Sequence, residues 1–375
     1  MIPKVATDIF KPKPEHIFIV GFSGGKDSLA VLLYLIYVLK AKRVIAVFAD
    51  TNHESQITYD YIETLKLEYG LPITTVTATL GEFADEKELA VVNILLRLDL
   101  VAEPCKTHLS RTLELAAEAK EAKDKPRAKL HLDRIKQLIT DAESLGLIWR
   151  DEPLTMERLA ILKRRFPSPM VRFCTTFLKL MPQRNWVTRY LKTLDAADVS
   201  RVIRVSGVRA QESSKRAKHP TAQFDDYMGC WLWLPIHKWT HEDVFEIAKK
   251  YEIPVNPLYK MGYGRVGCFP CINATKSELR SMATRHPETL VQLRGMEERA
   301  ADAVGKKAMS FFSNDKTPTR FHSHVCENSG KTFPDAMDVM RWALNLPSNP
   351  NQGLLFSEDD NEDSHSCSSK YGLCE

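Results

Sequence analysis

Six residues between two hydrophobic runs could bind a charged ligand. They form the sequence SGGKDS and are Ser23, Gly24, Gly25, Lys26, Asp27 and Ser28. Residues 17–20 before them are β-branched or aromatic, as in a buried strand, and the leucine-rich residues 29–39 after them are typical of a buried helix. Two adjacent glycines let the backbone approach a ligand, and the first turn of the helix presents free N–H groups to an anion. This SGGKDS loop therefore predicts a phosphate-binding turn between a strand and a helix.

Two common phosphate-binding patterns do not describe the SGGKDS loop. Val20 stands where a Walker-type loop has its first glycine, and Asp27 follows the lysine where serine or threonine is required. The dinucleotide pattern G-x-G-x-x-G also fails here. A tight turn with incidental glycines is the alternative, and a charged Lys26 at a buried crossing argues against it.

A second chemical signal is the C-x-x-C of Cys268 and Cys271, which lies in a loop rich in glycine and proline. This spacing lets two thiolates turn toward one ion, as in a zinc site or an iron–sulfur cluster, although a redox pair or coincidence would look the same. The chain has eight cysteines in 375 residues and no pattern of a small secreted disulfide scaffold. Metal or redox chemistry is therefore the expected use of these thiols.

The fold class follows from strands that alternate with helices. The strand-like runs are 17–20, 43–50, 72–79 and 201–208, and the helical patterns are 29–39, 54–69 and 240–251. This order predicts an α/β fold with a doubly wound parallel sheet. Residues 84–165 interrupt the order with Ala, Glu, Lys and Leu at helical spacing and a break at Pro126, which indicates an inserted helical hairpin or small subdomain.

These patterns divide the chain into five expected parts. They are the first part of a nucleotide-binding domain (1–82), a helical insertion (83–165), the second part of that domain with the cysteine motif (166–280), a helical C-terminal region (281–346) and a disordered acidic tail (347–375). Residues 351–375 carry six acids and one lysine, so this tail has a net charge of −5 and the rest of the chain +9. A modestly basic body suits a nucleotide or a nucleic acid but does not by itself identify either.

The composition excludes two further classes. The chain has no run of about 18 apolar residues, and its first residues lack the apolar core of a signal peptide. We therefore expect a cytoplasmic protein without membrane insertion.

Five stretches together resemble the phosphoadenosine phosphosulfate (PAPS) reductase family of the PP-loop ATP pyrophosphatase superfamily. Besides SGGKDS, they are VFADTNHE (47–54), FPSPMVRFCTTFLKLMP (166–182), SGVRAQESSKRA (206–217) and residues 233–272, which end in GCFPC. The resemblance covers roughly residues 15–280 without the helical insertion. It implies an adenine nucleotide alpha hydrolase-like fold.

The resemblance also implies a site. The residues expected to bind nucleotide are Ser23, Gly24, Gly25, Lys26, Asp27, Ser28, Asp50, Thr51, Gly207 and Arg209, and the expected catalytic residues are Lys26, Asp27, Arg209 and Arg216. Hard oxygen ligands suit Mg²⁺, so Asp27 is the expected Mg²⁺ contact of the loop, with helix capping as its alternative role. Arginines can clamp phosphate with two hydrogen bonds, although Arg209 and Arg216 around Glu212 could equally form a surface ion-pair network.

Two chemistries compete within this family. One is cleavage of ATP to AMP and pyrophosphate during sulfur activation or transfer, as in the sulfur-activating component of DNA phosphorothioation systems. The other is reduction of PAPS or adenosine phosphosulfate. Lys26 favours ATP because it places a point charge on the β and γ phosphates, and the terminal YGLCE lacks the Glu and His of the reductases' nucleophilic motif. The acceptor would be nucleic acid, the sulfur donor a cysteine desulfurase or a similar partner subunit, and a non-catalytic nucleotide-binding metal module is the third alternative.

For the metal centre, the resemblance places Cys174 with Cys268 and Cys271 as ligands of a [4Fe–4S] cluster. Adenosine phosphosulfate reductases carry a Cys-Cys pair where this chain has Phe173 and Cys174, so the fourth ligand is open. Cys230 is the provisional fourth ligand, with a buried core thiol as its alternative role. Further candidates are Cys105 and Cys326, while FHSHVC (321–326), with His322 and His324, keeps a zinc site as the alternative.

Overall fold

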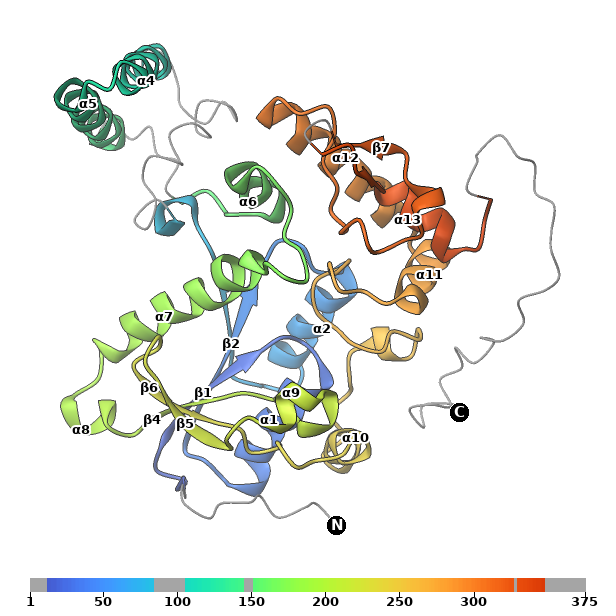
Figure 1. Ribbon diagram of the computed structural model, residues 1–375. Helices are drawn as coiled ribbons and strands as arrows, with labels where there is room; N and C mark the ends of the chain where they lie inside the picture. The colour runs from blue at the N-terminus through green and yellow to red at the C-terminus, as the bar shows by residue number, and fades with distance from the viewer. Residues whose placement is uncertain (1–11, 84–104, 145–150, 327–328, 348–375) are drawn as a thin grey trace.

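A six-stranded sheet forms the centre of the fold (Figure 1). The computed structural model describes residues 12–83, 105–144, 151–326 and 329–347. In spatial order the strands are β3 (Ile73–Thr77), β2 (Arg43–Asp50), β1 (Ile17–Phe22), β4 (Val202–Val205), β6 (Cys230–Trp233) and β5 (Ala222–Asp225). All neighbours pair in parallel except β5, which pairs antiparallel with β6. The predicted α/β class is confirmed, and the β5–β6 hairpin at one edge is an addition that the sequence analysis did not foresee.

The direction in which strands are added reverses beside β1. β2 and β3 lie on one side of β1, whereas β4 pairs with its other side. Open sheets of this kind bind ligands outside the carboxyl ends of the strands at such a switch point. The SGGKDS loop follows β1 and residues 206–209 follow β4, so both segments begin at the switch point.

Helices cover both faces of the sheet. The side chains of Phe18, Val20 and Phe22 pack in the core shared with α1 and α10, while Ile17 and Ile19 pack on the opposite face with α7. Because both faces are buried, β1 reads as a continuous hydrophobic run and not as an alternating one. The helices that cover these faces are α1 (Lys26–Leu33), α2 (Gln56–Leu67), α7 (Met181–Leu191) and α10 (His241–Lys250).

Two π-helical turns extend helices next to the sheet. The first, Tyr34–Val38, continues α1, and the second, Thr175–Leu180, leads into α7. Such turns are rare and occur frequently at functional sites, because the extra residue redirects a side chain. The second turn carries Lys179 and directly follows Cys174.

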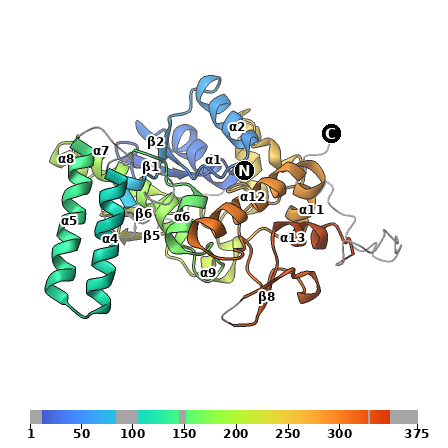
Figure 2. The same cartoon turned by 90° about the horizontal axis from the view of Figure 1, so that it is seen from above.

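Part of the expected helical insertion lies outside the described residues. The described part contains α4 (Cys105–Glu121), α5 (Lys125–Ser144) and α6 (Met156–Lys163), and Figure 2 shows α4 and α5 side by side. The break between them falls at residues 122–124 and not at Pro126. Pro126 instead occupies the first turn of α5, where its missing N–H has no intrahelical partner to lose.

The remaining helices form the C-terminal region. These are α11 (Lys276–Arg285), α12 (Pro287–Val304) and α13 (Ala336–Ala343), with the short hairpin β7 (His324–Val325) and β8 (Thr332–Phe333). Two four-residue helices, α8 (Ala196–Val199) and α9 (Ser214–Ala217), flank β4. The expected acidic tail lies outside the described residues apart from position 347.

A buried carboxylate holds the C-terminal region together. Glu297 on α12 is only 2% exposed, and its two oxygens accept hydrogen bonds from the backbone N–H groups of Phe311 at 2.7 Å and Ala336 at 3.0 Å. Burial raises the pKa of Glu297 to about 8, outweighing these two donors. The folded chain therefore holds a proton here at pH values where the unfolded chain has released it.

We expect stability to fall as the pH rises between the two pKa values of Glu297. The carboxyl group titrates near 4.5 when unfolded and near 8 when folded, so the free energy of unfolding decreases across this window by up to about 1.4 kcal/mol per pH unit. Below 4.5 and above 8 its contribution is flat. Urea unfolding from pH 5 to 8.5 should show a shallower slope in Glu297→Gln than in wild type. Glu298→Gln, which alters an exposed neighbour, should keep the wild-type slope, and equal slopes in all three proteins would contradict the assignment.

Candidate active site

The SGGKDS loop is shaped by its own serines and glycines. Gly24 has φ of +72°, a left-handed conformation that favours glycine, and Gly25 is the N-cap of α1. The Ser28 hydroxyl donates to the Gly25 carbonyl oxygen at 2.9 Å and accepts from the Ser23 N–H at 3.2 Å. The strand, turn and helix therefore follow one another as the sequence predicts, with the first turn of α1 at the switch point.

Two buried cations share one carboxylate at the start of α1. Lys26 is 6% exposed, and its Nζ lies 3.3 Å from Asp27 Oδ2 and 5.2 Å from the centroid of the Tyr259 ring. Arg209 is 4% exposed, and its Nε lies 2.5 Å from Asp27 Oδ1. The three side chains together carry a net charge of +1 beside the positive end of a helix dipole. This arrangement suits an anion such as phosphate.

Gly207 brings the segment after β4 directly onto the loop. A Cβ atom at this position would lie 2.7 Å from the backbone C and O of Asp27 and 3.0 Å from the backbone N of Ser28. Only glycine permits this approach, because backbone atoms cannot move aside as a flexible side chain can. The contact places Arg209, two residues further on, against Asp27.

The loop after β2 connects the nucleotide side of the sheet to the cysteines. Asp50 Oδ1 accepts from the Tyr59 hydroxyl at 2.7 Å and from the Asn52 N–H at 2.8 Å, so this carboxylate shapes its own loop. Thr51 is 1% exposed, and its Oγ1 lies 3.8 Å from the Sγ of Cys268. Thr51 therefore faces the C-x-x-C segment.

Arg216 differs from Arg209 in its surroundings. It is partly exposed on α9 and forms an ion pair with Glu212, which is the surface network weighed as the alternative. Its backbone carbonyl accepts from the ring Nε2 of His237 at 3.0 Å. The structure thus brings Arg209 to the SGGKDS loop but holds the Arg216 side chain with Glu212.

Three residues at the loop were missed by the sequence analysis. The Tyr259 hydroxyl accepts from the Lys26 N–H at 2.9 Å, and the Asn256 side-chain amide donates to the Gly24 carbonyl at 3.4 Å. Burial and the positive charges of Lys26 and Arg209 lower the pKa of His241, the first residue of α10. All three lie more than 200 positions after the loop. The only signal for them was their place in the resembling segment 233–272.

Three of the four expected metal ligands lie in one environment, here called the cysteine group: Cys174, Cys268 and Cys271. The charges of Cys174 and Cys271 affect each other, as do those of Cys268 and Cys271. Burial raises the pKa of the Cys174 thiol and raises that of Cys268 to about 12. Cations oppose this effect, because Lys179 hydrogen-bonds Cys268 and Arg265 hydrogen-bonds Cys271.

The spacing of the cysteine group limits the kind of centre it fits. Among the described residues, no three His, Cys, Asp or Glu side chains lie close enough together to hold a single metal ion. In a four-iron cluster each thiolate binds a different iron, so the thiols lie further apart than around one zinc ion. Three soft donors with two neighbouring cations therefore match three positions of a cluster.

Cys230 is separated from the cysteine group, which corrects its expected role as fourth ligand. The first residue of β6 is level with Ile17 of β1 and Arg43 of β2, because Trp231 pairs with Ile203 and the strands run parallel. Asp50 is seven residues further along β2, about 23 Å at about 3.3 Å per residue. The cysteine group adjoins the residue after Asp50, at the opposite edge of the sheet. Cys230 is buried beside Arg204 and Asp225, as a core thiol.

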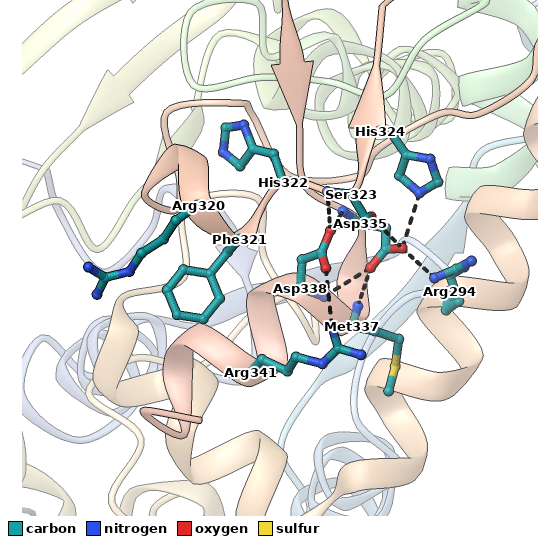
Figure 3. A pocket seen from close by; sticks show the side chains of 10 residues that line it. All are labelled: Arg294, Arg320, Phe321, His322, Ser323, His324, Asp335, Met337, Asp338 and Arg341. Atoms are coloured by element: carbon teal, nitrogen blue, oxygen red, sulfur yellow. Dashed lines mark hydrogen bonds and ion pairs between the residues drawn. The ribbon is translucent and has the colours of Figure 1, made fainter. Parts of the chain in front are cut away.

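The histidines of the zinc alternative are engaged elsewhere. His322 hydrogen-bonds Thr332 Oγ1 at 2.9 Å and the Thr317 carbonyl at 3.1 Å through its two ring nitrogens, and His324 Nε2 lies 3.1 Å from Asp335 Oδ2. Figure 3 shows His324 directed at Asp335, in a pocket of about 520 Å³ whose lining includes no residue of the SGGKDS loop or the cysteine group. The side chain of Cys105 lies outside the described residues.

Comparison with known proteins identifies the family. The phosphoadenosine phosphosulfate reductase domain matches residues 17–274, more than half of the chain. The chain belongs to the PAPS reductase domain family. An uncharacterized 37.8 kDa protein of Escherichia phage 186 is 33% identical to this family member over 362 residues, which are 96% of this chain and 97% of the phage protein. Adenosine 5'-phosphosulfate reductase of Burkholderia cepacia is 36% identical over 81 residues, which cover 22% of this chain and 32% of the reductase.

Solved structures give weaker likenesses. PAPS reductase from Candida auris, in a phosphate complex, has 16% identity and a TM-score of 0.34, and the match covers 68% of this chain and 82% of the reductase. FMN adenylyltransferase from Candida glabrata has 12% identity and a TM-score of 0.33 over 67% of this chain and 53% of the transferase. Among the described residues, no helix is both long and apolar enough to cross a membrane.

Proposed function

We propose that this PAPS reductase-family protein binds ATP with Mg²⁺ at the SGGKDS loop and cleaves it to AMP and pyrophosphate in sulfur activation or transfer. The observation that carries the proposal is the pair of buried cations, Lys26 and Arg209, on Asp27 at the start of α1. Buried cations are costly to desolvate, and a single carboxylate leaves one charge uncompensated. A polyphosphate supplies the missing negative charge.

The same residues suit cleavage at the α phosphate. Negative charge moves onto the leaving pyrophosphate in the transition state, and fixed donors that meet this charge lower the barrier. Lys26 supplies a point charge for the β and γ phosphates, and Arg209 offers a planar donor. Asp27 lies between the two cations and can exchange one of them for Mg²⁺ when nucleotide enters.

The proposal is tested by product analysis. Purified full-length protein is incubated with ATP and Mg²⁺, and AMP and pyrophosphate are quantified beside sulfite released from PAPS and from adenosine phosphosulfate. Equal amounts of AMP and pyrophosphate support the proposal. Sulfite release without ATP cleavage assigns the chain to the reductases, and ADP with phosphate as products overturns the proposed bond cleavage. ATP binding without any product would indicate the non-catalytic module.

For the acceptor and the sulfur donor we propose a nucleic acid and a partner such as a cysteine desulfurase. The support is the net charge of +9 on residues 1–350, which favours a polyanionic partner. ATP cleavage stimulated by DNA or RNA, with ³⁵S transferred from labelled cysteine in the presence of a desulfurase, would support this assignment. Transfer to a small molecule alone would replace the proposed acceptor.

We further propose that the cysteine group holds a [4Fe–4S] cluster, which would supply redox or sulfur chemistry beside the nucleotide. Cys268 lies 3.8 Å from Thr51 at the end of β2, so this chain places its soft donors next to the expected nucleotide site. Zinc remains the alternative metal, because thiolates bind both.

Replacing a thiol of the cysteine group is expected to remove the metal. Anaerobically purified wild type should be brown and contain iron and sulfide, whereas Cys268→Ser and Cys174→Ser should lose most of both because a hard hydroxyl replaces a soft thiolate. Cys230→Ser is the matched control and should keep the wild-type iron content, since this thiol lies at the other edge of the sheet. Colourless wild type with stoichiometric zinc would contradict the cluster, and full iron content in Cys174→Ser would remove that residue from the site.

A further inference from the structure

Glu54 carries a buried oxygen that nothing in the described structure satisfies. Its Oε1 accepts from the Thr51 hydroxyl at 2.8 Å, whereas Oε2 is inaccessible to solvent and has no hydrogen-bond partner among the described residues. Leaving a buried carboxylate oxygen unpaired costs free energy, and such a group calls for a ligand or a functional role. The sequence motif ADTNHE gave no separate role to this glutamate.

The glutamate faces the cysteine group. The Thr51 hydroxyl that donates to Glu54 also lies 3.8 Å from Cys268 Sγ, and the Glu54 carboxylate itself hydrogen-bonds the Cys268 thiol. The loop that carries Glu54 is fixed against the C-x-x-C segment by two hydrogen bonds. In these, the Phe269 N–H donates to the His53 carbonyl at 2.7 Å, and His53 Nε2 donates to the Pro270 carbonyl at 3.0 Å.

We propose that Glu54 is the fourth ligand of the centre held by Cys174, Cys268 and Cys271, binding through Oε2. This inference rests on the proposed cluster and completes its ligand set from a carboxylate at the end of β2. A cubane of four irons takes four protein ligands, and the cysteine group supplies three. Carboxylate oxygen is an accepted iron ligand, and Glu54 reaches the group from the side opposite Cys230's position in the sheet.

Charge balance around the group supports this assignment. Three thiolates and one carboxylate would bring four negative charges together. Lys179 interacts with Cys268, Cys271 and Glu54, and Arg265 and Lys316 both interact with Cys271. Three cations around four anionic donors offset most of the repulsion. An alternative role for Glu54 is solely to balance the charge of Lys179, and this role predicts no change at the metal when Glu54 becomes neutral.

Mössbauer spectroscopy of ⁵⁷Fe-reconstituted full-length protein distinguishes the two roles. In wild type we expect one iron in about four to differ from the other three, because oxygen replaces sulfur at that corner. Glu54→Gln should lose that distinct iron and show the EPR signal of a three-iron cluster. Glu54→Cys should restore four irons and make them alike, which a folding defect would not do. Glu63→Gln, on the exposed side of α2, is the matched control and should match wild type.

The outcomes separate this inference from the proposed cluster. Iron-free wild type after anaerobic reconstitution would overturn both. Iron-bearing wild type whose spectra are unchanged in Glu54→Gln would overturn the role of Glu54 alone and leave the cysteine ligands standing. Loss of all iron in Glu54→Gln with recovery in Glu54→Cys would support ligation.

Discussion

Lys26→Ala is expected to lower kcat/KM for ATP cleavage by about 10- to 150-fold. A lost charge-assisted contact costs about 1.5–3 kcal/mol, and each 1.36 kcal/mol corresponds to about a tenfold change in rate. The Nζ of Lys26 is buried beside Asp27, so no water-exposed cation nearby would replace it as the partner of the β and γ phosphates. Initial rates of AMP formation over a range of ATP concentrations measure the effect.

A lysine far from the loop supplies the control for this experiment. Lys42 is exposed next to the amino end of β2, at the edge of the sheet opposite the SGGKDS loop, and Lys42→Ala should keep the wild-type kcat/KM. Lys26→Arg tests geometry, because a planar guanidinium retains the charge but not the compact ammonium. Wild-type turnover in Lys26→Ala would rule out the loop as the ATP site.

Gly207→Ala is expected to reduce ATP cleavage by about 100-fold while the protein still folds. The new methyl group would lie 2.7 Å from the backbone of Asp27, so the SGGKDS loop and the segment after β4 must separate. Overpacking of this kind costs about 1–3 kcal/mol of stability, and a displacement of about 1 Å at a catalytic group can cost about 100-fold in rate. Because Arg209 follows two residues later, its contact with Asp27 should be weakened as well.

Gly295→Ala is the matched control, because it adds the same methyl group within α12. There the Cβ would meet only the mobile tip of Arg299, at 3.2 Å, and alanine is a better helix former than glycine by about 0.5–1 kcal/mol. Gly295→Ala should therefore raise the melting temperature slightly and leave ATP cleavage unchanged. A Gly207→Ala enzyme with wild-type kcat/KM would show that the close approach after β4 has no part in the site.

The sequence by itself determined the elements whose information is local. A continuous hydrophobic run, two glycines and a leucine-rich stretch predict a strand, a turn and a helix because each depends on residues within a few positions. Strand β2 was predicted with its observed bounds, and the capping box of Thr240 and Asp243 does begin α10. Motifs in order along the chain also indicated the family before any contact was known.

Other features were decided by the tertiary structure alone. The short strand β6 lacks a distinctive pattern of its own, so its pairing with β4 and β5 was not predicted, and that pairing carries Cys230 away from the cysteine group. Spacing in sequence says nothing about which edge of a sheet a residue reaches, since a shift along a strand moves a side chain by about 3.3 Å per residue. The same holds for Tyr259 at the backbone of Lys26 and for Glu54 beside Cys268, which meet their partners across more than 200 residues of chain. Which polar groups are buried together depends on the packing of segments distant in sequence, and the chain acquires that packing only when it folds.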